Sequence, residues 1–191
     1  MIQIHITEGK MKRSMGLWQL FGFAVTSLGG TLLHFLYDWT GGSVFAAPFS
    51  GINESTWEHM KLLFWPMFLY AILQRFFFPA ADDFWSVKLR GISLGLILIP
   101  VIFYTANGVF GKTPDWVNIS IFFLAAAAAY LYETKLFTLG TLTSKKPAAA
   151  LALLCGIGAA FVLFTFAPPD IGIFKEPNQA VQGSIYGIFG I

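Results

Sequence analysis

Charged residues are scarce in this chain of 191 residues. Asp, Glu, Lys and Arg together make up only 12% of it, whereas soluble domains carry about 25%. Hydrophobic residues make up 56%, and the mean hydropathy is +0.67. A chain with so few charges cannot cover a domain of this size with a solvated surface, which excludes an ordinary soluble enzyme. The composition therefore predicts an all-α integral membrane helical bundle.

Cysteine and the common catalytic motifs are also nearly absent. The single Cys155 cannot form an intrachain disulfide, and we interpret it as a small residue of the core. The chain has no His-Glu-x-x-His, no Gly-x-Ser-x-Gly, no phosphate-cradling glycine loop and no Cys-x-x-Cys, so the familiar hydrolase, nucleotide-binding and redox signatures are missing. It has neither a basic stripe nor a nucleic-acid-binding motif, and we expect no nucleic acid partner.

Long apolar segments, by contrast, are plentiful. The hydrocarbon core of a bilayer is about 30 Å thick, so a helix needs about 20 residues to cross it. Five segments reach that length, and the chain leaves no room for a separate soluble domain. We predict one membrane-embedded domain, 1–191, with helices at residues 16–39, 57–78, 85–108, 116–137 and 147–167. The tail, 168–191, begins with two prolines and is not expected to span.

Basic residues predict the orientation of the chain. With a cytoplasmic N-terminus, nine Lys and Arg residues lie on the cytoplasmic side and three on the other, a clear positive-inside bias. We therefore expect a multi-pass protein embedded in the lipid bilayer of an inner or plasma membrane. The cytoplasmic set is Lys10, Lys12, Arg13, Arg75, Lys88, Arg90, Lys135, Lys145 and Lys146, and the other set is Lys61, Lys112 and Lys175.

Small residues recur at helical spacing in three of the expected helices. Such residues let helix backbones approach closely in a membrane. We predict helix contacts at each of these sites, which are Gly91-x-x-x-Gly95, the run Ala125–Ala129, and Ala152-x-x-x-Gly156-x-x-x-Ala160.

The densest polar cluster precedes the second helix, from Asn53 to Lys61. Part of it has a structural explanation. Asn53 is a good N-cap, and Ser55 with Glu58 fits the Ser-x-x-Glu capping box, so one of these pairs should start the helix. Glu58 and Lys61 are three residues apart and are expected to pair on the surface. These roles leave His59 and one glutamate unexplained.

A second polar pattern follows one face of the first helix. Ser27, Gly30, Thr31, His34 and Asp38 recur at steps of three or four residues, so they share a face that should point into the bundle. Only a short loop separates this face from the cluster at the second helix. We predict that both patterns contribute to one outward-facing pocket, with His34, Asp38, Glu54, Glu58, His59 and Lys61 as the candidate site residues.

Three motifs, taken in order, cover nearly the whole chain. They are His34-x-x-Tyr37-Asp38-Trp39, then Asn53-Glu54-Ser55-x-Trp57-Glu58-His59-x-Lys61, then a tail running from Pro168-Pro169 through Phe174-Lys175-Glu176-Pro177 to Tyr186-Gly187-Ile188. With these motifs the chain resembles a family of small prokaryotic membrane proteins of unknown function. The resemblance implies a polytopic bundle and supplies no activity.

The pocket leaves three functions open. The first is binding of a small ligand or ion, because ionisable groups that face a bundle interior mark such sites. The second is a membrane-embedded hydrolase, in which His34, Asp38, Glu58 and His59 would hold a divalent metal such as zinc or iron. The third is an accessory subunit or scaffold for a membrane partner protein. A continuous proton relay is not expected, because Glu133 and the other acids nearer the cytoplasm should lie at the membrane boundary.

Overall fold

A computed structural model shows an all-helical molecule and describes residues 2–78, 82–139 and 146–176. Long apolar runs form the helices, and the polar, glycine- and proline-containing segments connect them. The elements are α1 (Ile2–Trp39), α2 (Thr56–Phe77), α3 (Phe84–Phe110), α4 (Asp115–Leu139), α5 (Pro147–Phe166) and a short 3₁₀ helix, η1 (Gly172–Phe174).

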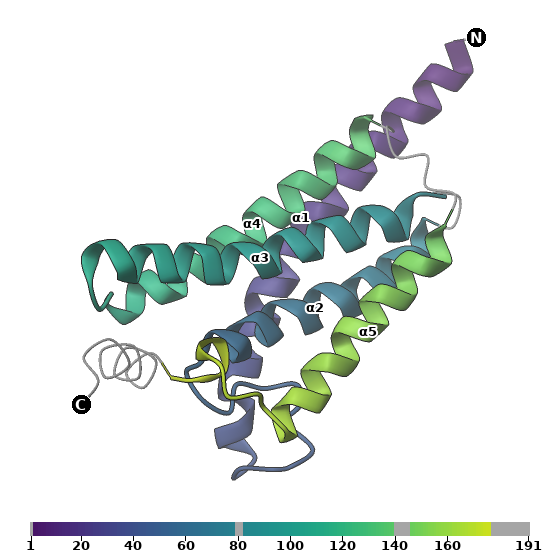
Figure 1. The fold of residues 1–191 in the computed structure, drawn as a ribbon. Helices are drawn as coiled ribbons and strands as arrows, with labels where there is room; N and C mark the ends of the chain where they lie inside the picture. Colours follow the sequence, from purple (N-terminus) through teal and green to yellow (C-terminus); the bar gives the residue numbers. More distant parts are fainter. Residues whose placement is uncertain (1, 79–81, 140–145, 177–191) are drawn as a thin grey trace, which may run out of the picture.

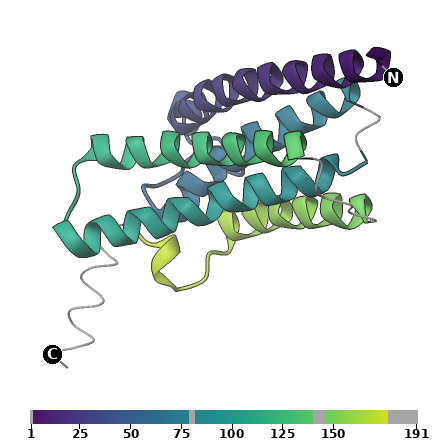
Figure 2. The ribbon, with the colours of Figure 1, turned by 90° about the horizontal axis from the view of Figure 1, so that it is seen from above.

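The five α-helices pack as one bundle (Figure 1). Helices α1 and α5 lie on opposite sides, with α2 and α3 between them, and α4 pairs closely with α3 (Figure 2). The predicted helices are confirmed, with ends that differ by one or two residues except at the N-terminus. There α1 begins at Ile2, and its 38 residues extend over about 57 Å. Its N-terminal turns therefore project beyond the bundle (Figure 1).

Four helices are long and apolar enough to cross a membrane: α1 from Ser14 onward, α3, α4 and α5. Their outward faces carry large apolar side chains such as Leu131 and Leu153, as lipid contact requires. The protein is thus a multi-pass membrane protein. Helix α2 has 22 residues but a more polar sequence, and 12 of those residues are buried. Because neighbouring helices cover it, α2 can carry polar side chains that a lipid-facing helix could not.

The core forms where α2, α3, α4 and α5 meet. Leu63 and Phe64 of α2 are fully buried there, as is Leu154 of α5. Two predictions of close helix packing are confirmed. A Cβ atom added to Gly95 would lie 2.7 Å from Leu63, and Ala125 and Ala129 have no exposed surface.

The helix contact predicted at the small residues of α5 is not made with another described helix of this chain. Ala152 and Gly156 are exposed, and nothing lies within 4 Å of a Cβ built on Gly156. The prediction for Cys155 is wrong as well, because it is exposed rather than part of the core. Helix α5 instead packs through Leu154, Gly158 and two later residues on the same face. Spacing alone could not distinguish this face, because every face of α5 is apolar.

The described part of the tail, residues 167–176, folds against the bundle. The Phe174 ring in η1 lies 4.6 Å from the Trp57 ring at the start of α2. Beside it, Lys175 Nζ is 2.7 Å from Asp170 Oδ1. The hydrogen bond and positive charge from Lys175 lower the pKa of the exposed Asp170 carboxyl below its usual value. The rest of the predicted non-spanning tail, 177–191, lies outside the described residues.

Candidate functional site

Helix α2 begins with a cap formed by Ser55. Its hydroxyl accepts a hydrogen bond from the Glu58 amide at 3.4 Å, and Asn53 supports it by accepting from the Ser55 amide at 2.9 Å. The reciprocal bond of a capping box is not made. The Glu58 carboxylate instead accepts from the amide of Ile52 at 3.0 Å. The start of α2 is therefore tied to the preceding loop as well as to its own first turn.

Glu58 and Lys61 do form an ion pair, but the surface location expected for it is wrong. Lys61 Nζ lies 2.6 Å from Glu58 Oε2, and the two side chains are 0% and 4% exposed. The Lys61 ammonium also donates to the carbonyl of Ala47 at 2.7 Å and to the hydroxyl of Thr165 at 3.0 Å. These contacts join α2, the loop before it and α5. Neither Glu58 nor Lys61 lines the pocket described below, which corrects the prediction that they belong to it.

Three of the predicted residues do converge. Glu54 lies between two imidazole rings, with Oε1 3.9 Å from His34 Nε2 and Oε2 3.5 Å from His59 Nε2. The His59 ring is oriented from its other side, where Nδ1 lies 2.9 Å from the carbonyl oxygen of Ser55. A carbonyl can only accept, so Nδ1 carries the proton and Nε2 faces Glu54. Both histidines are partly buried, whereas the Glu54 side chain is 64% exposed.

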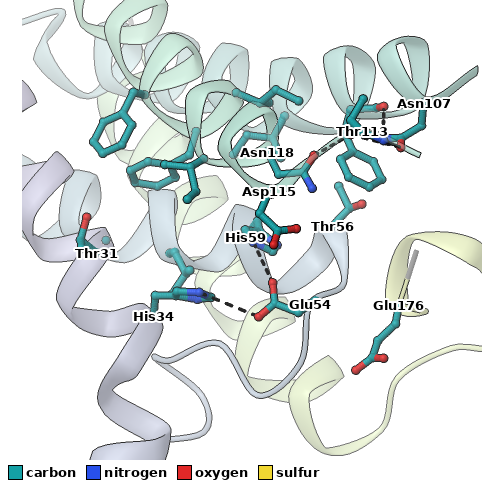
Figure 3. Close-up of a pocket in the computed structure, with 18 of the residues that line it drawn as sticks. Thr31, His34, Glu54, Thr56, His59, Asn107, Thr113, Asp115, Asn118 and Glu176 are labelled. Atoms are coloured by element: carbon teal, nitrogen blue, oxygen red, sulfur yellow. Dashed lines mark hydrogen bonds and ion pairs between the residues drawn. The ribbon is translucent and has the colours of Figure 1, made fainter. Parts of the chain in front are cut away.

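These three side chains line a cavity of about 540 Å³ between α1, α2, α3 and α4 (Figure 3). Helices α2, α3 and α4 contribute polar groups near one end of the cavity and apolar groups a turn or so farther along. On α2, for example, His59 is followed one turn later by Leu62. The polar lining residues include Thr31, His34, Glu54, His59, Asn107, Asp115 and Asn118, and the apolar ones include Leu62, Ile99, Phe103, Ile121 and Phe122.

Gly30 sets the width of the cavity on the α1 side. A Cβ atom at this position would overlap the Phe122 ring and would lie 3.0 Å from the carbonyl oxygen of Leu62. The α1 backbone can therefore approach α2 and α4 closely only because position 30 has no side chain. Of the predicted polar face of α1, Gly30 is buried in the bundle and His34 is partly buried, whereas Thr31 lines the cavity but is exposed.

Asp38 does not join the site, contrary to the prediction. It is exposed near the C-terminal end of α1 and is not among the cavity-lining residues. The reason is the path of the next loop, in which the Ser50 hydroxyl accepts from the Tyr37 amide at 2.8 Å and donates to the carbonyl of Leu33. This contact folds the loop back along α1, so that Glu54 is placed beside His34 and not beside Asp38.

The predicted metal set is not assembled. Glu58 is committed to Lys61 and Asp38 is exposed elsewhere, which leaves only His34 and His59 near each other, with ring centroids 5.8 Å apart. Across residues 2–78, 82–139 and 146–176, no group of three or more His, Cys, Asp or Glu side chains is arranged to hold a metal ion. The residues present therefore do not fit the divalent metal that the hydrolase alternative requires.

Comparison with known families gives one match. A model of a family of unknown function, DUF6512, matches residues 8–188. The chain belongs to DUF6512. Neither curated proteins nor solved structures gave a match. Membership of DUF6512 agrees with the resemblance to a family without an assigned activity, and the accessory-subunit alternative stays a prediction.

Sequence reasoning for this DUF6512 protein missed a hydrogen-bonded turn at the edge of the cavity between α1, α2, α3 and α4. Thr113, in the turn between α3 and α4, donates its amide to Asn107 Oδ1 at 3.0 Å and its hydroxyl to Asn118 Oδ1 at 3.0 Å. Both asparagines line the cavity. The sequence did contain an indication of this turn, because three amide or hydroxyl side chains lie in or near a short polar segment. Such a composition favours hydrogen bonds from side chains to the backbone.

A second missed cluster lies at the other end of the bundle. Lys88 of α3 and Glu133 of α4 were expected at the membrane boundary, but they are 1% and 0% exposed and form an ion pair of 2.6 Å. Gln19 of α1 donates to Glu133 Oε2 at 3.1 Å and accepts from Lys88 Nζ at 3.2 Å. The signal for this cluster was weak, because an acid near a helix end is usually solvated.

Proposed function

We propose that this protein binds a small amphiphilic molecule in the cavity between α1, α2, α3 and α4. The observation that carries the proposal is the convergence of His34, Glu54 and His59 at one end of a cavity of about 540 Å³ whose remaining wall is largely apolar. Ligand sites typically have volumes of about 300–1,000 Å³ and combine an apolar lining with a few oriented polar groups.

The two parts of the cavity suit two parts of one molecule. Leu62, Phe103 and Phe122 offer carbon surface to an apolar body. Burial of that body would supply most of the free energy of binding, at roughly 25 cal/mol for each Å² removed from water. The polar end would then determine the orientation of the ligand.

The polar end favours a head group that carries hydrogen-bond donors, such as an ammonium group. Glu54 is an acceptor when ionised, and its oxygens lie 3.5 Å or more from the imidazole nitrogens that face them. A head group beside Glu54 would therefore meet an acceptor that is not already occupied by a close hydrogen bond. Asp115 and Glu176 also line the cavity, whereas Lys112 is the one lysine in its lining, so negative side chains predominate there.

Fluorescent probes with different head groups can test this proposal on the purified full-length protein in detergent. A dansyl probe with an alkyl ammonium head should bind, and its sulfonate counterpart should bind more weakly. Glu54→Gln should weaken binding of the ammonium probe by about tenfold to a hundredfold, since a hydrogen bond to a charged group contributes about 1.5–3 kcal/mol.

Asp38→Asn is the matched control. It removes a carboxylate from the same end of the bundle, but Asp38 is exposed and does not line the cavity. Binding of the ammonium probe should therefore be unchanged. Equal binding of both probes, with no effect of Glu54→Gln, would contradict the proposed orientation of the ligand. Loss of all binding in Gly30→Leu, which fills the cavity wall, would support the location itself.

A further inference from the structure

The buried cluster of Lys88, Glu133 and Gln19 lies apart from the cavity and plays no part in the proposed ligand binding. It joins three helices, because Gln19 comes from α1, Lys88 from α3 and Glu133 from α4. Ionisable residues inside a membrane bundle are costly, and they commonly mark a functional site. A buried pair is also weak evidence for stability alone, since an apolar replacement is often as stable.

The two oxygens of Glu133 differ sharply in their surroundings. Oε2 receives both hydrogen bonds, from Lys88 Nζ at 2.6 Å and from Gln19 Nε2 at 3.1 Å. Oε1 is equally buried but has no hydrogen-bond partner among the described residues. It is turned towards Gly91 of α3, where an added Cβ atom would overlap it. An ionised carboxylate spreads its charge over both oxygens, so a bare buried oxygen is unfavourable.

Few other polar groups face this carboxylate. From α2 comes the Tyr70 hydroxyl, which donates to the carbonyl of Trp18 at 2.6 Å. Tyr130 precedes Glu133 by one turn of α4, and its ring centroid lies 5.4 Å from Lys88 Nζ. The guanidinium of Arg75 lies over the ring of Phe84, which Lys88 also approaches. Lys88 is thus the one cation in direct contact with Glu133 among the residues that the structure describes.

We propose that Glu133 is a proton-binding site. The incoming proton adds to Oε1, the oxygen without a donor, and forms an O–H bond there. Lys88 keeps its three protons and its bonds to Oε2 and Gln19, so the net charge of the pair rises from zero to one. Protonation removes the bare buried negative oxygen, and deprotonation restores the neutral pair.

We further propose that protons move between this site and the cavity along polar side chains of α1 and its neighbours. The hydroxyl groups of Thr26 and Tyr130 lie 2.8 Å apart, and either can donate to the other. Next to Thr26, the Ser27 hydroxyl is buried without a partner among the described residues. One turn farther, Thr31 lines the cavity, as does His34. From Gln19 to His34 helix α1 rises about 22 Å, most of the thickness of a bilayer core.

Infrared spectroscopy of the full-length protein in phosphatidylcholine vesicles tests the site. As the pH falls across about 9 to 4, a carbonyl band of a buried protonated carboxyl group should appear. Glu133→Gln, which keeps the shape of the side chain, should abolish the band. Glu133→Asp should shift the frequency of the band, so a carboxyl group at this position remains visible even if Glu133→Gln folds poorly. Lys88→Met should show the band up to a higher pH than the wild type, because the ionised Glu133 carboxylate then has no cation beside it.

Asp38→Asn is the matched control and should keep the band, because Asp38 is exposed at the far end of the bundle and does not line the cavity. A wild-type protein without such a band, or a band that survives Glu133→Gln, would overturn the proposal. The route has its own test in the rate at which the band appears after a pH jump. Thr26→Val and Tyr130→Phe should each slow it by about a hundredfold or more, since a positioned proton donor contributes about 10²–10⁴-fold to a rate.

Thr134→Val is the control for the rate measurement. Thr134 lies beside Glu133 on α4, but its hydroxyl donates to the carbonyl of Tyr130 within the same helix at 2.7 Å. Its replacement should leave the rate unchanged. Rates that are equal in wild-type protein, Thr26→Val and Tyr130→Phe would overturn the route along α1.

Discussion

Among the residues whose burial the structure describes, two lysine side chains are fully buried, and each contacts one glutamate. Lys61 pairs with Glu58 within α2, and Lys88 pairs with Glu133 between α3 and α4. In the first pair Lys61 also donates to Ala47 and Thr165, Glu58 Oε2 also accepts from Ile52, and neither Glu58 oxygen is among the fully buried side-chain atoms without a partner in the described residues. The second leaves one glutamate oxygen bare. Because of this difference, we interpret the Lys61 pair as structural and propose proton binding only for the Lys88 pair.

The Lys61 pair should be important for stability. Lys61→Met leaves the Glu58 carboxylate buried without its cation, which should lower the free energy of unfolding by about 3–5 kcal/mol. Adding Glu58→Gln should recover most of that loss, because no uncompensated charge then remains. Unfolding in detergent, induced by sodium dodecyl sulfate and followed by circular dichroism, measures both effects.

The exposed pair of Asp170 and Lys175 provides the comparison. Asp170→Asn should not change the unfolding midpoint, because an ion pair open to solvent contributes little. A single variant Lys61→Met as stable as the wild type, or a double variant no better than the single one, would show that the pair does not stabilise the bundle.

At the scale of helices, the contact of α3 with α4 depends on a missing side chain. A methyl group at Gly91 would overlap Glu133. Gly91→Ala should therefore destabilise the protein by about 1–3 kcal/mol, the usual result of overpacking a tight interior. The same unfolding measurement would detect the change.

Gly156→Ala makes the same chemical change in α5 and serves as the control. Nothing lies within 4 Å of the added atom there. Because alanine favours a helix over glycine by about 0.5–1 kcal/mol, this variant should be as stable as the wild type or slightly more so. A loss of stability as large as that of Gly91→Ala would mean that the face of α5 with Ala152 and Gly156 contacts another molecule.

The sequence predicted the helices well and their faces less well. Apolar length determines where a membrane helix can lie, so the predicted ends nearly all fall within two residues of those observed. The face of a helix is harder to predict when lipid and protein both accept apolar residues. This explains the errors at Gly156 and Cys155. On α1 the polar pattern located the cavity-lining residues Gly30, Thr31 and His34, but the fully buried polar residues of this helix are Gln19 and Thr26.

At the scale of the whole molecule, polar groups gather near both ends of the bundle. The cavity with His34, Glu54 and His59 lies at one end, and Lys88 with Glu133 lies towards the other. Three of the six predicted site residues lie close together because a short loop connects α1 and α2. Glu58 was assigned wrongly because sequence spacing shows a possible ion pair but not whether helix α5 will cover it.

We propose that the cavity end faces away from the cytoplasm, as the basic residues predict. Cysteine labelling in a Cys155→Ala background tests this orientation. A maleimide that cannot cross membranes should label Lys112→Cys in intact cells, because Lys112 is exposed in the turn between α3 and α4. Asp82→Cys, exposed before α3, should react only after the membrane is permeabilised. The opposite labelling pattern would reverse the assignment.

The hydrogen bond from Lys61 to Thr165 also has a consequence for biosynthesis. The two residues are separated by 104 positions along the chain. At a translation rate of about 5–20 residues per second, α5 leaves the ribosome roughly 5–20 s after α2. During that interval the ammonium of α2 has the Glu58 carboxylate but not its final hydroxyl partner. The hydrogen bonding of the Lys61 ammonium is therefore completed only when α5, the last of the described α-helices, packs against α2.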